Sequence, residues 1–93
     1  MIKRAYLDVE TTGTIPYLHG MYELAGVIDI DGEVEEEFCF LMYPFHDDEW
    51  DPGAEKVNGM NMEKLKCMDG VMSPEDAFRA FKKILLKYID EKD

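Results

Sequence analysis

The dipeptide Asp31-Gly32 separates two segments in which apolar and polar side chains alternate. A period of two is typical of β-strands, and Asp-Gly is a frequent hairpin turn. A two-residue loop would place Ile30 opposite Glu33, whereas a three-residue loop would place it opposite Val34. The longer loop keeps apolar residues on one face through two further pairs, Gly26 with Phe38 and Leu24 with Phe40. We therefore predict a hairpin of residues 21–30 and 34–42 with a three-residue loop.

The other segments give a simple order of elements around this hairpin. Residues 2–9 form an apolar run that indicates a largely buried strand. Residues 54–67, after an acidic loop, indicate two short helical turns interrupted at Asn58-Gly59. A longer helix begins after Ser73, which can cap it and is followed by a proline suited to the first helical position. The predicted fold class is α/β, an antiparallel three-strand meander followed by helices, in one small domain of 93 residues.

Acidic residues are concentrated in the first part of the chain. Residues 1–55 carry fourteen acidic and two basic side chains, a net charge of −12, whereas residues 56–93 carry a net charge of +1. Proteins that coat nucleic acid usually present a basic surface. This distribution argues against such a protein and leaves room for a site that meets phosphate groups through metal ions.

The sequence contains no segment typical of secretion or membrane insertion. Residues 1–8 lack the apolar core of a secretory signal, and the longest nearly apolar run, residues 38–45, is too short to span a bilayer. We therefore expect a cytoplasmic protein in which Cys39 and Cys67 are reduced. These cysteines, His19 and His46 are enough in number for a zinc site, but the paired spacings of structural zinc sites are missing.

Two acids one residue apart, Asp8 and Glu10, follow the first predicted strand. Residues i and i+2 of a strand point to the same face, so the two carboxylates should lie together. A hard divalent cation such as Mg²⁺ or Mn²⁺ would relieve their repulsion. Thr11 and Thr12 can donate hydrogen bonds to a substrate, and Gly13 allows a bulky group to approach closely. The alternative is that both acids are simply solvated at an ordinary strand end.

A phosphatase of the haloacid dehalogenase type also carries an acid pair after its first strand. The second acid of that pair is normally aspartate and a parallel sheet follows it, whereas Glu10 and a hairpin follow here. The sequence therefore disfavours this class of enzyme.

The string D-V-E-T-T-G of residues 8–13 resembles the first motif of the DEDD (DnaQ-like) 3′-to-5′ exonuclease superfamily, which includes the proofreading epsilon subunit of bacterial DNA polymerase III. The sequence YELAGVIDIDGEVEEEFCFLMYP is similar to the second and third strands of that family. The later segments DPGAEKVNGMNMEKL and SPEDAFRAFKKIL are similar to the helices that follow. The likeness covers nearly the whole chain in order, and it implies that residues 1–93 are the N-terminal half of a ribonuclease H-like exonuclease domain.

The resemblance implies roles for individual residues. Asp8 and Glu10 would be catalytic, as the first two of four acidic ligands that hold two Mg²⁺ or Mn²⁺ ions. Contacts to the 3′-terminal nucleotide are implied for Thr11, Thr12, Gly13, Asn58 and Met60. The implied reaction is in-line hydrolysis of a phosphodiester at the 3′ end of single-stranded DNA or RNA.

The later motifs of the family, with the remaining ligands and the general base, are not found in residues 1–93. We therefore expect the chain to be inactive by itself, and we expect His19 and His46 to be surface residues rather than catalytic bases. Three hypotheses stay open. The first is that the chain is part of an exonuclease domain. The second is that it is a short inactive relative that serves in binding or assembly, and the third is that it is an acidic protein-interaction domain.

The lack of the family's later strands would leave the first strand as an open edge of the sheet. Open apolar edges tend to pair with other strands. We therefore predict a homodimer in which the first strands pair or the exposed faces pack. The sequence predicts no particular polymerase partner.

Overall fold

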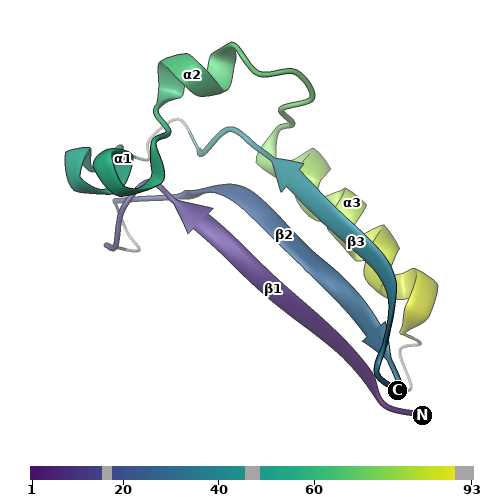
Figure 1. The fold of residues 1–93 in the computed structure, drawn as a ribbon. Coiled ribbons are helices and arrows are strands. Elements are labelled where there is room, and N and C mark those ends of the chain that lie inside the picture. Colours follow the sequence, from purple (N-terminus) through teal and green to yellow (C-terminus); the bar gives the residue numbers. More distant parts are fainter. Residues whose placement is uncertain (16–17, 46–48, 90–93) are drawn as a thin grey trace.

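The computed structural model describes residues 1–15, 18–45 and 49–89. Three strands, β1 (Lys3–Thr11), β2 (Met21–Ile30) and β3 (Glu33–Leu41), form one antiparallel sheet in the order β1-β2-β3. They are followed by the helices α1 (Pro52–Asn58), α2 (Met62–Lys66) and α3 (Pro74–Tyr88) (Figure 1). This order of elements confirms the predicted α/β class.

A two-residue turn closes the β2–β3 hairpin, so the predicted three-residue loop is wrong. Asp31 and Gly32 adopt positive φ angles of 52° and 89°. Two successive residues with positive φ make the tight turn whose twist matches that of the flanking strands, and aspartate tolerates this conformation better than most residues. Ile30 consequently pairs with Glu33 and not with Val34.

A β-bulge at Glu35 then corrects the register further along the hairpin. Asp29 pairs with Val34, but the preceding residue of β2, Ile28, pairs with Glu36. One extra residue on β3 has the same effect on the later pairs as one extra residue in the loop. The predicted pairs deeper in the hairpin are therefore confirmed, Gly26 with Phe38 and Leu24 with Phe40.

Helix α3 covers one face of β2 and β3. Its Ala77 is buried against Leu24 of β2 and against Met42, which follows β3. Further apolar side chains pack around this centre, namely Met21, Phe38, Phe40, Met72 and Phe81. The opposite side of the helix presents exposed basic residues. Within the described part of the chain, no helix combines the length and the apolar character needed to cross a bilayer.

Specific hydrogen bonds fix both ends of α3. The Ser73 hydroxyl accepts a bond of 3.2 Å from the Asp76 backbone N–H, which confirms the predicted cap. At the other end, Lys87 Nζ and the Tyr88 hydroxyl donate to Glu36 Oε1 at 2.8 and 2.7 Å. The last turn of the helix is thereby tied to β3 at the point where the bulge ends.

The short helices α1 and α2 lie beyond the C-terminal end of β1 (Figure 1). The Asp51 carboxylate accepts a bond of 2.7 Å from the Gly53 N–H, so α1 begins two residues before the predicted helical segment. Gly59, at φ 70°, ends α1 and confirms the predicted interruption. Asn61 caps α2, and Leu65 is its one fully buried residue.

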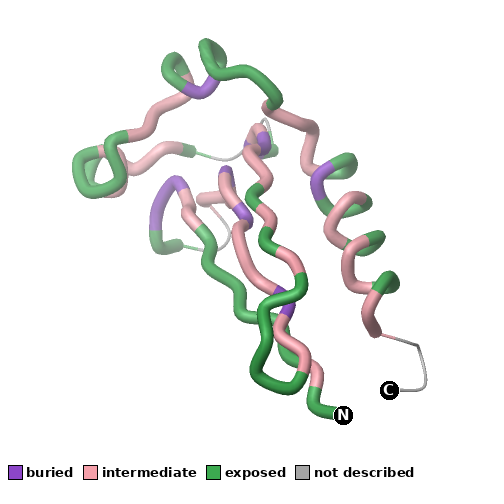
Figure 2. The backbone as a smooth tube through the Cα atoms, turned by 45° about the vertical axis from the view of Figure 1, so that its right-hand side comes forward, coloured by how far each residue is buried: buried purple, intermediate pink, exposed green. Residues whose placement is uncertain are grey.

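Strand β1 has the least cover of the three strands. Tyr6, Leu7 and Val9 are 51%, 50% and 42% exposed, and Figure 2 shows exposed residues along most of this strand. The prediction of a largely buried first strand is therefore wrong for the described residues. The physical reason is position, because β1 is an edge strand and α3 packs on the other two.

Candidate functional site

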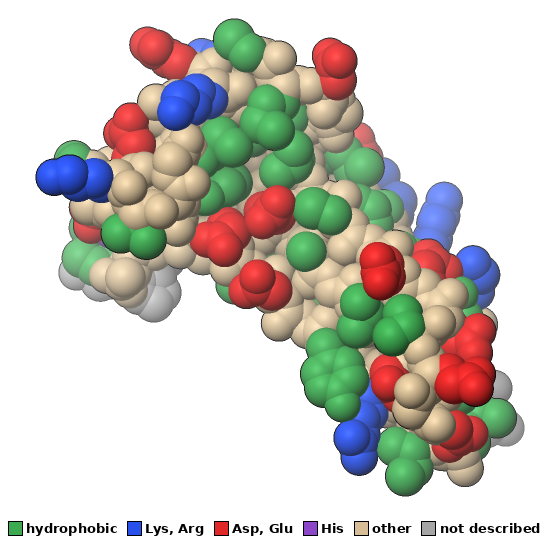
Figure 3. Space-filling model, viewed as in Figure 1, with side chains coloured by type: hydrophobic (Ala, Val, Ile, Leu, Met, Phe, Trp, Pro, Cys, Tyr) green, Lys and Arg blue, Asp and Glu red, His purple; other side chains and the backbone are tan. Residues whose placement is uncertain are grey.

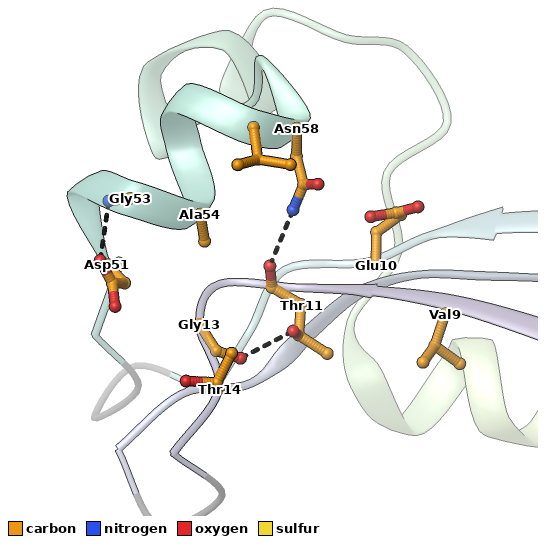
Figure 4. Close-up of a pocket in the computed structure, with 10 residues that line it drawn as sticks. Val9, Glu10, Thr11, Gly13, Thr14, Asp51, Gly53, Ala54 and Asn58 are labelled. Atoms are coloured by element: carbon orange, nitrogen blue, oxygen red, sulfur yellow. Dashed lines mark hydrogen bonds between the residues drawn. The ribbon is translucent and has the colours of Figure 1, made fainter.

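Asp8 and Glu10 project from the same face of β1, as their spacing predicted. In the ladder Asp8 pairs with Ala25 and Glu10 pairs with Glu23, and Figure 4 shows Glu10 and Val9 pointing to opposite sides of the strand. Acidic side chains accordingly gather at the middle of the face seen in Figure 3, where the sheet approaches α1. Sequence reasoning missed Glu23, because only the register of β1 on β2 places it opposite Glu10.

Little positive charge offsets these carboxylates. The side chains of Asp8 and Glu10 make no hydrogen bond or ion pair with another described residue. Glu23 Oε1 accepts a hydrogen bond of 3.4 Å from Cys39 Sγ. Burial, and then this hydrogen bond, raise the pKa of the Cys39 thiol, which keeps it a neutral donor. The three acids thus form a negative patch that attracts a hard cation.

Tyr22 is a buried polar residue next to the acids. Its ring stacks on Trp50, with the ring centroids 5.4 Å apart. Burial raises the pKa of the Tyr22 hydroxyl, the negative charges of Glu10 and Glu23 raise it further, and a hydrogen bond with Asn58 acts in the opposite direction. The hydroxyl therefore stays protonated beside the carboxylates. Sequence reasoning missed Tyr22, because regular alternation along β2 places it on the opposite face from Glu23.

The turn after β1 is held by hydrogen bonds within the protein. Thr12 is fully buried, and its N–H donates to the Gly20 carbonyl at 2.8 Å. The Thr12 hydroxyl accepts a bond of 3.0 Å from the Gly20 N–H and donates to the Glu49 carbonyl. Thr11 Oγ1 donates to the Gly13 carbonyl at 2.8 Å. The Thr12 side chain is thus engaged in holding the turn, and its contact with a nucleotide stays a prediction.

Gly13 makes room for the ring of His19. A Cβ at Gly13 would lie 2.3 Å from His19 Nδ1, closer than real Cβ contacts allow. The same Nδ1 accepts a hydrogen bond of 3.0 Å from the Ile15 N–H. His19 therefore packs within the loop between β1 and β2. His46, the other predicted surface histidine, lies outside the described residues.

A cavity of about 410 Å³ opens between the end of β1 and helix α1 (Figure 4). Its walls include Glu10, Thr11, Gly13 and Asn58, for all of which the family resemblance implied a role at the metal or the nucleotide. Asn58 Nδ2 donates to the Thr11 carbonyl at 3.3 Å, which joins α1 to the end of β1. Met60 lies in an adjacent hollow of about 360 Å³ that also reaches Glu10 and Asn58. The chain therefore brings most of the predicted site residues to one region.

Asp8 and Glu10 have the ligand type that Mg²⁺ and Mn²⁺ prefer, since carboxylate oxygens are hard donors. Among the residues that the structure describes, no group of three or more His, Cys, Asp or Glu side chains is arranged to hold a metal ion. The pair therefore offers part of a coordination shell. For the zinc alternative, Cys39, Cys67 and His19 do not come together, and the fourth candidate is outside the described residues.

No protein-family model matches the sequence, and no curated protein matches it either. Among solved structures, the crystal structure of E. coli Exonuclease I in complex with a dT13 oligonucleotide matches with a TM-score of 0.69 and 26% sequence identity. The chain has a nuclease-domain-like fold.

This likeness covers 91% of the present chain and 18% of the Exonuclease I chain. The three strands and their helices thus match part of the ribonuclease H-like fold of a DEDD-type exonuclease. The acids of β1 and the cavity beside α1 lie within the described part of this fold.

Proposed function

We propose that this chain supplies the first part of a metal-dependent 3′-to-5′ exonuclease site, which hydrolyses phosphodiester bonds at the 3′ end of DNA or RNA. The observation that carries the proposal is the pair of carboxylates, Asp8 and Glu10, which point to one face without a partner among the described residues. Glu10 lines a cavity together with Thr11 and Asn58, on a fold shared with an exonuclease that was crystallised with an oligonucleotide.

Each residue has a physical task in this proposal. Asp8 and Glu10 hold the metal, and a bound divalent ion supplies Lewis-acid chemistry at the scissile phosphate. Asn58, Thr11 and Gly13 contact the terminal nucleotide from the cavity wall. Tyr22 places a protonated hydroxyl beside the acidic patch.

The remaining ligands and the general base must come from groups beyond those described here, since the chain spans 18% of the length of Exonuclease I. We therefore expect no nuclease activity from the chain by itself. A narrower assignment, to an epsilon-like proofreading subunit with a polymerase partner in DNA replication, rests on the sequence motif alone.

Metal binding tests the proposal directly. Titration of the chain with Mn²⁺, followed by electron paramagnetic resonance, should show weak binding that Asp8→Ala or Glu10→Ala lowers at least about tenfold, because each substitution removes a charged oxygen ligand. Glu33→Ala is the matched control, since it removes one exposed carboxylate at the other end of the sheet. Mn²⁺ binding that is unchanged by Asp8→Ala would contradict the assignment.

An acidic binding module without catalysis is the second candidate. The exposed glutamates of β3, Glu33, Glu35 and Glu37, add a second anionic surface that a metal site does not require. Binding of a single-stranded oligonucleotide that depends on Mn²⁺ and on Glu10 would favour the exonuclease site. Binding of a basic protein that is lost after charge removal on β3 would favour the module.

A further inference from the structure

A hydrogen bond to the backbone fixes the orientation of the Asn58 side-chain amide at the end of α1. Its Nδ2 donates to the Thr11 carbonyl oxygen at 3.3 Å (Figure 4). A carbonyl oxygen can only accept, so the amide nitrogen must lie on this side and the amide oxygen, Oδ1, on the other. Apart from the Tyr22 hydroxyl, no described group lies near enough to donate a hydrogen bond to Oδ1.

The Tyr22 hydroxyl does not occupy this acceptor. Burial raises the pKa of the Tyr22 hydroxyl, whereas its hydrogen bond with Asn58 acts to lower it. A bond that the amide nitrogen donates to the hydroxyl oxygen has this direction, because it favours the deprotonated form. The amide nitrogen carries two hydrogens and can therefore serve both Thr11 and Tyr22. Asn58 Oδ1 is thus left for a ligand.

Glu10 places a second acceptor beside the Asn58 amide oxygen. The cavity of about 410 Å³ and the adjacent hollow of about 360 Å³ share three lining residues, Glu10, Val57 and Asn58. Figure 4 shows the Asn58 amide oxygen directed toward the side on which the Glu10 carboxylate lies. Two acceptors therefore meet where the two hollows join, so a ligand bound there must bring hydrogen-bond donors.

The surrounding residues suit the different parts of a nucleotide. Ala54 and Val57 supply apolar contacts in the larger cavity, which suit the flat faces of a base. Asp8 and Glu10, which hold the metal in the proposed function, attract the phosphate through it. The sugar joins the base to the phosphate and consequently lies at the two acceptors. At a 3′ end a ribose offers two neighbouring hydroxyl donors, whereas a deoxyribose offers one.

We propose that the site takes a ribonucleotide at the 3′ end, whose 2′-hydroxyl donates a hydrogen bond to Asn58 Oδ1 and whose 3′-hydroxyl donates to the Glu10 carboxylate. This assignment rests on the proposed function and narrows its substrate class to RNA 3′ ends. A deoxyribonucleotide leaves Oδ1 without a partner. The loss of one such hydrogen bond should weaken binding by about fivefold.

Nucleotide binding to the chain tests this preference. Titrations in excess Mg²⁺, followed through the backbone amide signals in NMR spectra, compare uridine 5′-monophosphate with its 2′-deoxy and 2′-fluoro analogues. Fluorine replaces the hydroxyl by an atom of similar size that has no hydrogen to donate. We expect the ribonucleotide to bind about fivefold more tightly than either analogue.

Substitution of Asn58 tests the residue that reads the sugar. Asn58→Ala should bring the three affinities within about twofold of one another. The ratio of affinities is the decisive measure, because poorer support of α1 alone would weaken all three ligands alike. Lys56→Ala, a change at an exposed residue of the same helix, is the matched control and should keep the fivefold ratio.

The possible failures separate this inference from the proposed function. Equal affinities for the three ligands, all lowered by Glu10→Ala, would support the nucleotide site but overturn the role of Asn58. A preference between uridine and cytidine monophosphates that Asn58→Ala removes, with the ribose-to-deoxyribose ratio unchanged, would show that Asn58 reads the base and would also overturn it. The absence of binding by any of these nucleotides at millimolar concentrations would contradict the proposed function together with this inference.

Discussion

Replacing Gly26 by alanine should destabilise the sheet strongly, because the centre of β2 has no room for a Cβ. An added Cβ would lie 2.4 Å from the Tyr6 carbonyl oxygen on β1 and 2.8 Å from Phe38 Cζ on β3. The first separation falls 0.6 Å short of the 3.0 Å that real Cβ contacts keep. The atom in the way belongs to the backbone of a paired strand, so it cannot swing aside as a side chain can.

The loss of stability in Gly26→Ala follows from the backbone movement that the added Cβ requires. Relief requires β1 and β2 to separate locally, which combines overpacking with weakened cross-strand hydrogen bonds. We expect Gly26→Ala to lower the free energy of unfolding by about 2–4 kcal/mol. This is a large share of the roughly 5–15 kcal/mol that stabilises a typical domain. In a chain of this size the melting temperature should fall by roughly 10–30 °C.

Urea denaturation followed by circular dichroism measures this difference. Gly53→Ala in α1 is the matched control, because its Cβ would approach only the flexible Asp51 side chain, at 3.1 Å. Adding Phe38→Leu to Gly26→Ala should not restore stability, since the Tyr6 carbonyl remains. A Gly26→Ala variant within about 0.5 kcal/mol of wild type would refute the reasoning from the backbone contact.

Three further substitutions test other contacts. Thr12→Val removes a buried hydroxyl with two backbone partners and should lower the free energy of unfolding by about 1–3 kcal/mol in urea denaturation. Ser73→Ala removes the cap of α3 and should cost about 1 kcal/mol in the same assay. Hydrogen bonds from Lys87, and then from Tyr88, lower the pKa of Glu36. These hydrogen bonds therefore stabilise the folded state fully above the pKa of an unfolded glutamate, and this stabilisation is lost as the pH falls through the lowered pKa of Glu36. In thermal melts across pH, Glu36→Gln should therefore be less stable than wild type at neutral pH and should converge with it in strong acid.

The helices and strands were predictable because local chemistry fixes them. Ser73 before a proline marks the start of α3, since its hydroxyl can satisfy a free N–H of the first turn. Gly59 marks the end of α1, because glycine adopts positive φ without a steric penalty. The spacing of Asp8 and Glu10 likewise fixed their common face, since a strand alternates regardless of what surrounds it.

Features that depend on how strands meet were not predictable in this way. A third residue in the loop and a bulge at Glu35 would give the same strand pairs further along the hairpin. Hydrophobic alternation therefore cannot distinguish the two arrangements. Tyr22 is the extra residue where the pairing passes from Glu10–Glu23 to Thr11–Met21, and no local pattern marks that irregularity. The exposure of β1 was missed for a similar reason, because an apolar strand looks the same whether or not a second layer covers it.

The strand order has a consequence for how the chain reaches its fold. Each strand pairs with its neighbour along the sequence, so every sheet contact closes a short loop at low entropic cost. The tight turn at Asp31-Gly32 lets the β2–β3 hairpin form first, and β1 can join across the connection of residues 12–20. A two-stranded hairpin alone is only marginally stable in water, and a further strand or a packed helix is needed to stabilise it. The docking of α3, which leaves the ribosome last among these elements, should therefore be the step that commits the chain to its folded state.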